Sequence, residues 1–159
     1  MHNERIAIIG GTFDPIHNGH LALAHAAIEI FDCNKCLLLP SAHPYHREQP
    51  ISSYVERCEM LQLAIQNEKQ IEVVNTSSFE DKFTYTYNSL CYIKTLYPSA
   101  ELIFALGTDA AQFLDSWYMA PELIELAKLA VFNRPGYSDL FKTTSLSQLS
   151  SSRHFFYKN

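Results

Sequence analysis

Residues 10–20 constrain this chain most, because they join an apolar run to a helical pattern across a glycine turn. They read Gly-Gly-Thr-Phe-Asp-Pro-Ile-His-Asn-Gly-His and lie between the strand-like residues 6–9 and a helix-like run that starts at Leu21. Glycine lets backbone N–H groups approach a phosphate closely, and a helix N-terminus favours negative charge. The two histidines beside this turn, His17 and His20, indicate chemistry on a phosphate.

Composition limits the class of protein. The chain has 159 residues, of which 47% are hydrophobic and 18% charged, and this predicts one globular domain with a core of its own. A net charge of -5 argues against a general nucleic-acid binder, but not against small anions held in a cleft. The apolar runs are too short to cross a bilayer and the start is polar, so we expect a cytoplasmic protein without membrane contact. The oligomeric state stays open, and a homo-oligomer is one of the alternatives.

Strand-like and helix-like segments alternate along the chain. The expected strands cover residues 5–9, 35–39, 71–74, 101–106 and 129–132. The expected helices cover residues 19–31, 53–66, 86–97, 110–114 and 122–127. This order predicts an α/β fold, a Rossmann-like parallel sheet with helices on both faces. The segments after three strands (residues 10–20, 40–47 and 107–109) should then meet at the carboxyl rim of the sheet, where such folds bind ligands.

Helical periodicity also predicts which side chains face the core. In residues 53–66 the inward positions are Val55, Met60, Leu63 and Ala64, with Ser52 or Ser53 as the cap. In the other two long helices the inward positions are Leu21, Ala24, Ile28, Phe31, Leu90, Ile93 and Leu96. We place the domain at residues 1–137. Residues 138–159 are rich in serine and threonine and show no clear helix or strand period, so we expect them to form a loosely ordered tail.

The spacing of His17 and His20 puts both rings on one side of a helix start. There they could hold the oxygens of a transferring phosphoryl or nucleotidyl group, or they could simply cap the helix. A zinc site shared with a second such pair, His43 and His46, is disfavoured because neither pair has an acidic or cysteine ligand at a useful offset. Cys33 and Cys36 end a helix instead of starting one, which favours free buried thiols over a redox pair.

Several other polar and aromatic residues near the rim have two interpretations each. Arg47 and Arg57 could bind phosphate or be solvated cations. Asp109 could bind a ribose hydroxyl or cap a helix that starts at Ala110. The pair Trp117 and Tyr118 could stack on a heterocyclic base or pack in the core.

Residues 10–20 resemble the signature of the HxGH nucleotidylyltransferases. Further segments resemble the bacterial nicotinate-mononucleotide adenylyltransferases within that superfamily, and the likeness runs from Arg5 to Tyr137. These segments are residues 40–47, Arg57, residues 85–86, 107–109, 117–118 and 134–137.

The resemblance implies transfer of AMP from ATP to nicotinate mononucleotide, which gives deamido-NAD and pyrophosphate in NAD biosynthesis. ATP and nicotinate mononucleotide are the implied partners, and Mg²⁺ would arrive bound with ATP, without direct protein ligands. The implied catalytic residues are His17 and His20. The implied ATP-binding residues are Gly10, Gly11, Thr12, His17, His20, Gly107 and Asp109. The implied mononucleotide-binding residues are Phe13, His46, Arg47, Thr86, Asp109, Trp117, Tyr118 and Arg134.

The resemblance also leaves alternatives. The family continues through an Ile-Ser-Ser/Ala-Thr-x-Ile-Arg segment that binds ATP phosphates, whereas this sequence ends at Asn159 with only a distant match in residues 150–153. One alternative on that ground is a truncated nucleotide-binding relative with weak or absent turnover with ATP. A second alternative is adenylyl transfer to another phosphorylated substrate, such as phosphopantetheine.

Overall fold

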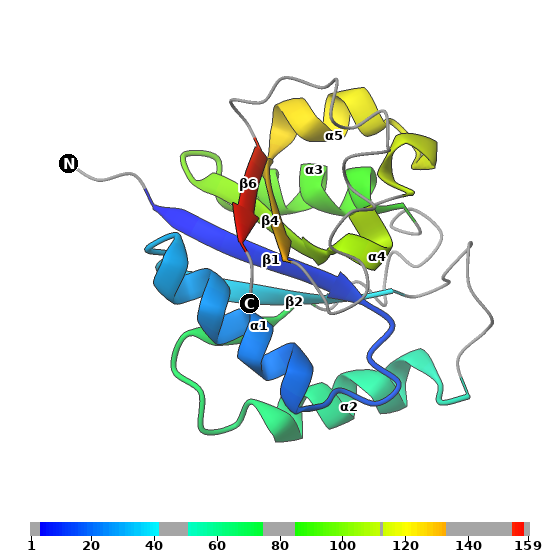
Figure 1. The fold of residues 1–159 in the computed structure, drawn as a ribbon. Helices are drawn as coiled ribbons and strands as arrows, with labels where there is room; N and C mark the ends of the chain where they lie inside the picture. The colour runs from blue at the N-terminus through cyan, green and yellow to red at the C-terminus, as the bar shows by residue number, and fades with distance from the viewer. Residues whose placement is uncertain (1–3, 42–50, 75–84, 112, 133–153, 158–159) are drawn as a thin grey trace.

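The computed structural model describes residues 4–41, 51–74, 85–111, 113–132 and 154–157. Its centre is a parallel sheet with the strand order β3-β2-β1-β4-β5-β6 (Figure 1). The strands are β1 (Arg5–Gly11), β2 (Lys35–Pro40), β3 (Ile71–Val73), β4 (Glu101–Gly107), β5 (Lys128–Phe132) and β6 (His154–Tyr157). The helices are α1 (Asn18–Ile30), α2 (Tyr54–Ala64), α3 (Thr86–Leu96), α4 (Thr108–Ala111), the 3₁₀ turn η2 (Leu114–Ser116) and α5 (Ala120–Leu126). The five predicted strands are confirmed.

Strand β1 lies at the point where the strand order reverses. It pairs with β2 on one side, with Gly11 opposite Pro40, and with β4 on the other, with Ile9 opposite Ala105. In open parallel sheets, ligands bind outside the carboxyl ends of the strands at this point. The segment after Gly11 therefore starts at the position where a binding site is expected.

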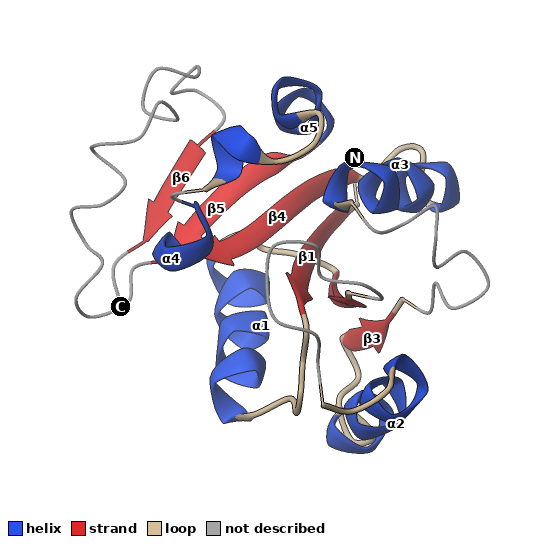
Figure 2. Ribbon diagram, turned by 90° about the vertical axis from the view of Figure 1, so that its right-hand side faces the viewer, coloured by secondary structure: helices blue, strands red, loops and turns tan. Residues whose placement is uncertain are grey.

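Helices cover both faces of the sheet, as predicted. Figure 2 shows α1 and α2 on one side of the strands and α3 and α5 on the other. Alternate residues of β1 supply the two cores: Ile8 packs in the cluster that includes Leu90 and Leu123, and Ile9 packs in the cluster that includes Ala24 and Leu61. Because β1 is buried on both faces, its apolar residues form a continuous run in the sequence.

The tail contains a strand that the sequence analysis did not predict. Residues 154–157 form β6, which pairs in parallel with β5 so that Leu129 lies opposite His154 and Phe132 opposite Tyr157. These four residues therefore form a strand in a tail whose sequence shows no clear strand period. Their sequence, His-Phe-Phe-Tyr, has the aromatic character of a strand, but four residues are too few to show a period. Residues 138–153 and 158–159 lie outside the described residues.

Helix α2 turns a different face to the core from the predicted one. Val55 and Leu63 are 58% and 67% exposed, whereas Tyr54, Arg57 and Leu61 are buried. Of the other two predicted positions, Ala64 is exposed and Met60 is half-buried. The cause is the buried arginine, whose guanidinium hydrogen-bonds to backbone carbonyls and so fixes the rotation of the helix.

The remaining predictions about helices are mostly confirmed. Ser53 caps α2, because its hydroxyl accepts the N–H of Glu56 at 3.1 Å. In α3, Leu90 and Ile93 are buried as predicted, but Leu96 is 50% exposed. In α1, Ala24 is buried, and Leu21, Ile28 and Phe31 are partly buried against the same cluster.

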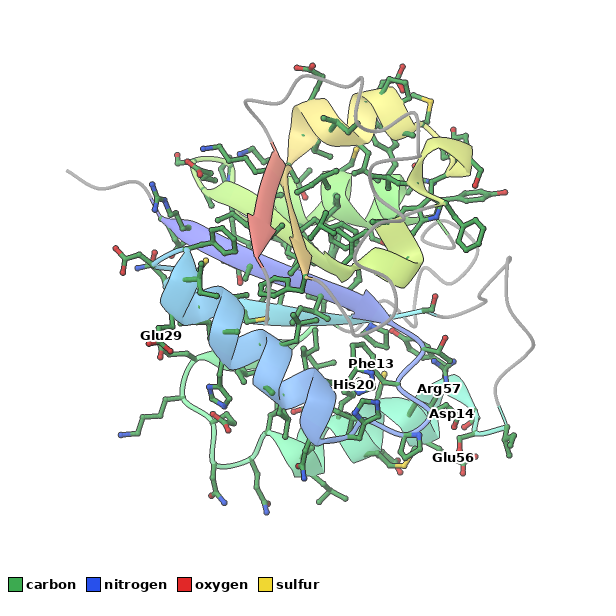
Figure 3. The ribbon with its side chains drawn as sticks, viewed as in Figure 1. Phe13, Asp14, His20, Glu29, Glu56 and Arg57 are labelled. Atoms are coloured by element: carbon green, nitrogen blue, oxygen red, sulfur yellow. The ribbon has the colours of Figure 1, made fainter. Side chains whose placement is uncertain are left out.

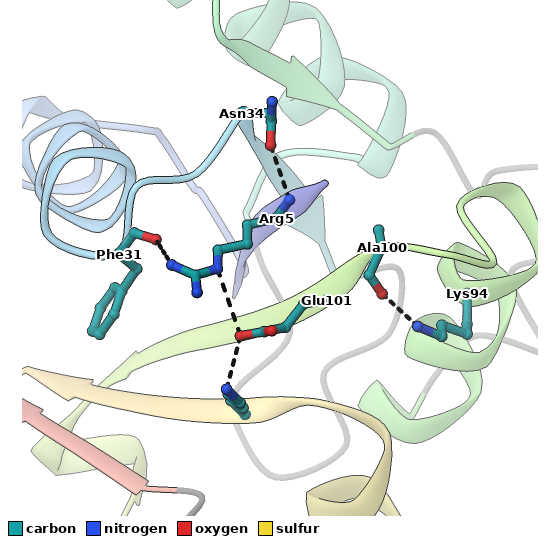
Figure 4. Close-up of polar contacts among 7 residues, drawn as sticks. Arg5, Phe31, Asn34, Lys94, Ala100 and Glu101 are labelled. Atoms are coloured by element: carbon teal, nitrogen blue, oxygen red, sulfur yellow. Dashed lines mark hydrogen bonds and ion pairs between the residues drawn. The ribbon is translucent and has the colours of Figure 1, made fainter. Parts of the chain in front are cut away.

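Polar contacts fasten the amino ends of the strands, at the edge opposite the carboxyl rim (Figure 4). A carboxylate oxygen of Glu101 lies 3.8 Å from Nε of Arg5 and 2.9 Å from Nζ of Lys128. The Arg5 side chain also donates to the carbonyl of Phe31 at 3.1 Å. On the neighbouring helix, the Lys94 ammonium donates to the carbonyl of Ala100. These contacts join β1, β4, β5 and the loop after α1 at one end of the sheet.

Cys33 and Cys36 are free and buried, which confirms the prediction for this pair. Burial raises the pKa of Cys33 to about 11 and that of Cys36 to about 12, so both remain thiols at neutral pH. Among the described residues, no helix has the length and apolar character that a membrane crossing needs.

Two leucines on α2 test its observed rotation. Leu61 is fully buried and Leu63 is mostly exposed. We expect Leu61→Ala to lower the free energy of unfolding by about 2–5 kcal/mol, because it opens a cavity in the core. We expect Leu63→Ala to change it by no more than about 0.5 kcal/mol. Urea unfolding of both variants measures the difference, and equal effects would contradict the observed rotation.

Candidate active site

The turn after β1 is compact because a phenylalanine folds back over a glycine. A Cβ added at Gly11 would lie 3.2 Å from the Phe13 ring, closer than nearly all real contacts of this kind. Phe13 itself is 2% exposed and has a φ of 52°, in the left-handed region that bulky residues rarely adopt. A side chain at the second glycine of the turn would therefore crowd the buried Phe13 ring.

The two histidines form a capping box at the start of α1. His17 is the N-cap, and its Nδ1 accepts the N–H of Gly19 at 3.1 Å. In return, Nδ1 of His20 accepts the backbone N–H of His17 at 3.1 Å. The two rings are stacked, with centroids 3.7 Å apart and an angle of 24°. The capping interpretation is thus correct for both residues, with imidazoles in the places that serine and glutamate usually take.

These hydrogen bonds also decide what the rings can offer a ligand. A ring nitrogen that accepts an N–H bond carries no proton, so in a neutral imidazole the proton lies on the other nitrogen. His17 and His20 therefore hold their protons on Nε2 when neutral, and Nε2 is then a donor. The first turn of α1 contains no acidic residue that would compete for these donors. Capping and anion binding are compatible here, because they use different ring nitrogens.

Gly19 is the residue that makes this arrangement fit. A Cβ at this position would lie 2.9 Å from Cε1 and 3.0 Å from Nδ1 of His17. The imidazole could not then lie over the Gly19 amide. The glycine between the two histidines is therefore a steric requirement of the cap.

The ring of His20 rests against Phe13. Their centroids are 4.9 Å apart and the planes meet at 69°, an edge-to-face contact. Figure 3 shows Phe13 and His20 beside the start of α1, with Asp14 and Arg57 close by. The buried phenylalanine thus supports the imidazole from the core side.

Asp14 and Arg57 attach this loop to the start of α2. The Asp14 carboxylate accepts the backbone N–H groups of Ile51 at 2.7 Å and of Ser52 at 3.3 Å. Hydrogen bonding lowers the pKa of Asp14, chiefly from the Ser52 side chain and also from these two N–H groups. Arg57 is 1% exposed and donates to the carbonyl of Thr12 at 2.7 Å. Arg57 is therefore neither a solvated cation nor a surface phosphate ligand.

The loop after β4 lies on the same rim. Strand β4 ends at Gly107 and α4 begins at once with Thr108, so Asp109 lies inside α4. The interpretation of Asp109 as the cap of a helix starting at Ala110 is wrong. Because β4 pairs directly with β1, Gly107 ends its strand beside the glycine turn.

Aromatic residues from two separate segments gather near the start of α3. Tyr118 is 47% exposed, and its ring lies 4.6 Å from that of Tyr85 at an angle of 32°. Trp117 packs instead against the core, with its ring 6.1 Å from that of Phe104. Thr86 directly follows Tyr85 and begins α3. Sequence reasoning did not assign Tyr85 to the site, since its stacking partner lies far along the chain.

Three predicted site residues, His46, Arg47 and Arg134, lie outside the described residues, as does His43. Within the described part of the chain, no group of three or more histidine, cysteine, aspartate or glutamate side chains is placed to hold a metal ion. The described rim therefore offers hydrogen-bond donors from the glycine turn, the imidazoles and the start of α1.

Comparison with known proteins relates this geometry to a family. The model for cytidylyltransferase-like proteins matches residues 8–154. A relative from Idiomarina loihiensis is 42% identical over 130 residues, which are 82% of this chain and 62% of the relative. A relative from Methylacidiphilum infernorum is 38% identical over 154 residues, which are 94% of this chain and 74% of the relative. Both are named as probable nicotinate-nucleotide adenylyltransferases.

A solved structure has the same fold. The nicotinic acid mononucleotide adenylyltransferase of Plasmodium falciparum, complexed with NaAD, matches with a TM-score of 0.77 at 18% identity. The match covers 98% of this chain and 75% of that one. This chain thus spans 62% of the length of the relative from Idiomarina and 74% of that from Methylacidiphilum. It belongs to the cytidylyltransferase-like family, in the group of the nicotinate-nucleotide adenylyltransferases.

Proposed function

We propose that the protein transfers AMP from ATP to nicotinate mononucleotide and releases pyrophosphate. The observation that carries the proposal is the histidine capping box at the start of α1, which follows β1, the strand at which the strand order reverses. The names of its relatives support nicotinate mononucleotide as the acceptor.

In this reaction a phosphate oxygen of the mononucleotide attacks the α-phosphorus of ATP in line. The new P–O bond forms as the bond to the β-phosphate oxygen breaks, and pyrophosphate leaves with that electron pair. No side chain needs to form a covalent bond, so catalysis depends on positioning and on stabilising charge. In the proposal, His17 and His20 donate from Nε2 to the phosphate oxygens, and the backbone of Gly10, Gly11 and Thr12 lines the phosphate path.

Mg²⁺ suits this rim as an ion that arrives with ATP. The described rim presents N–H and imidazole donors, whereas Mg²⁺ prefers carboxylate, phosphate and water oxygens. The one carboxylate of the glycine turn, Asp14, is already an acceptor for two backbone N–H groups. When bound, the ion would neutralise charge on the phosphate oxygens.

The aromatic group near α3 fits the pyridine side of the acceptor. The rings of Tyr118 and Tyr85 lie beside one another as a tilted pair, so a flat ring could pack against them. The N-cap of α3, Tyr85, makes no side-chain cap hydrogen bond, and a carboxylate is a suitable acceptor for the first N–H groups of a helix. We therefore assign the nicotinate carboxylate to the Thr86 end of α3. The other proposed residues on the acceptor and ribose side are Phe13, His46, Arg47, Gly107, Asp109, Trp117 and Arg134.

The direct test is release of pyrophosphate from ATP and Mg²⁺ with nicotinate mononucleotide. We expect turnover, and a preference over nicotinamide mononucleotide of about tenfold or more in kcat/KM, because the amide lacks the charge that α3 would bind. Phosphopantetheine serves as the third substrate. Turnover with phosphopantetheine alone, or with none of the three, would exclude the proposal.

Replacing either histidine should abolish most of the reaction without unfolding the protein. We expect His17→Ala and His20→Ala each to lower kcat about 10²–10³-fold, because a donor to the transition state is lost. The control is His25→Ala, which removes an exposed histidine of the same helix that pairs with Glu68 at 3.0 Å. A histidine variant with the kcat of the control would refute its assigned role.

Gly19→Ala should displace the His17 ring without removing any imidazole. The added methyl group would lie 2.9 Å from that ring, so the cap should break and the helix should lose about 1 kcal/mol of stability. We expect kcat to fall about 10–100-fold as the donor moves. Asn18→Ala, at the exposed neighbouring position, is the matched control. Thermal unfolding and kcat of both variants measure the effect, and equal values would argue against the steric role.

A further inference from the structure

We propose that Arg57 is a positioning residue for His20, acting through the peptide between Thr12 and Phe13. The effect of Arg57 on turnover rests on the proposed function, whereas the chain of contacts from Arg57 to His20 does not. Among the described residues, the contacts trace a link from α2 to the imidazole pair through the loop that follows β1.

The first step is a buried cation placed between two loops. Arg57 is 1% exposed, and one of its terminal nitrogens, Nη1, donates to the carbonyl of Thr12 at 2.7 Å and to that of Ser41 at 2.8 Å. Its Nε donates to the carbonyl of Ser52 at 3.3 Å. Thr12 follows β1 and Ser41 follows β2, so one side chain holds the loops after two neighbouring strands. Burying a cation is costly, and an apolar residue would fill the same space more cheaply.

The second step is the conformation of the residue after Thr12. The carbonyl of Thr12 and the amide of Phe13 belong to one rigid peptide plane, so a hydrogen bond to the carbonyl restrains the orientation of that plane. Phe13 follows with a φ of 52°. A bulky residue keeps such a conformation only where its surroundings hold it. The bond from Arg57 is the strong contact on the plane that defines this angle.

The third step leads from Phe13 to the imidazoles. The left-handed backbone turns the Phe13 ring inward, against Gly11 and against the face of the site where His20 lies. The rings of Phe13 and His20 are 4.9 Å apart. His20 in turn accepts the N–H of His17. A change at Arg57 should therefore reach both imidazoles through one backbone plane and one ring contact (Figure 3).

Asp14 provides a second attachment between the loop after β1 and the start of α2. Its carboxylate accepts the N–H groups of Ile51 and Ser52, and the carbonyl of Ser52 accepts from Arg57. The loop is thus held at Thr12 by the arginine and at Asp14 by the backbone just before α2. With both attachments in place, the Phe13 residue between them has little freedom to turn.

The experiment compares two arginines that act at opposite ends of β1. Arg57 on α2 binds the loop after the strand, and Arg5 is the first residue of the strand. Arg57→Met keeps apolar volume but removes the bonds to both loops, and Arg57→Lys restores a charge that can reach the carbonyls without the planar fork. Arg5→Met is the matched control, since Arg5 also donates to a backbone carbonyl, that of Phe31, but at the amino end of the strand. In each variant, kcat is expressed per folded molecule and KM is measured for both substrates.

We expect Arg57→Met to lower kcat about 10–100-fold while each KM changes less than about threefold, because a displaced donor weakens the transition state more than substrate binding. Arg57→Lys should recover part of this loss. Arg5→Met should lower the Tm and leave kcat per folded molecule unchanged. If Arg57 had only a structural role, Arg57→Met would lower the Tm and leave kcat per folded molecule unchanged, as in the control.

NMR of the histidine ring signals tests the link without any substrate. We expect the His20 signals to shift in Arg57→Met and in Phe13→Leu, which removes the neighbouring ring, and to stay in place in Arg5→Met. Should Arg57→Met not fold, Arg57→Lys and Phe13→Leu decide the question. Unshifted His20 signals in folded Arg57→Lys, together with an unchanged kcat, would overturn the proposal. If the wild type shows no turnover, shifted His20 signals still support the link, and the failure then belongs to the proposed function.

Discussion

Two hydrogen bonds from backbone N–H groups to imidazole nitrogens determine the rest of the candidate site. The amide of Gly19 donates to His17, and the amide of His17 donates to His20. Each bond satisfies an N–H group that the helix start leaves without a partner, and each fixes which ring nitrogen faces outward. The helix cap and the proposed anion-binding surface are consequently one structure. A substitution that harms the cap harms the surface as well.

This cap depends on a turn whose geometry comes from packing. Gly11 accommodates the ring of Phe13, and Phe13 supports His20, so the first and last parts of the turn are in contact through the core. Arg57 and Asp14 tie the same turn to α2. The rigid parts of the site thus include residues that no ligand would touch. These contacts explain why the turn after β1 carries a buried aromatic residue and a carboxylate.

The sequence predicted the sheet because buried parallel strands are continuous apolar runs, as in Ile6–Ile9 within β1. It predicted the histidine pair because those residues are close in sequence. It missed the contact of Tyr85 with Tyr118 and the bond from Arg57 to the Thr12 carbonyl, since both depend on contacts between distant segments. Periodicity assigned the wrong face to α2 because it treats a buried arginine as polar.

The distribution of charge explains how a chain with a net charge of -5 can offer a site to anions. Ion pairs gather where strands begin: Glu101 pairs with Arg5 and Lys128, and Glu72 pairs with Lys35. At the opposite rim, the Asp14 carboxylate accepts hydrogen bonds from two backbone N–H groups. The donors of the described rim are backbone amides and imidazoles, which attract phosphate through dipoles and hydrogen bonds at short range. Local geometry therefore outweighs net charge, and the acidic composition is no obstacle to binding a nucleotide.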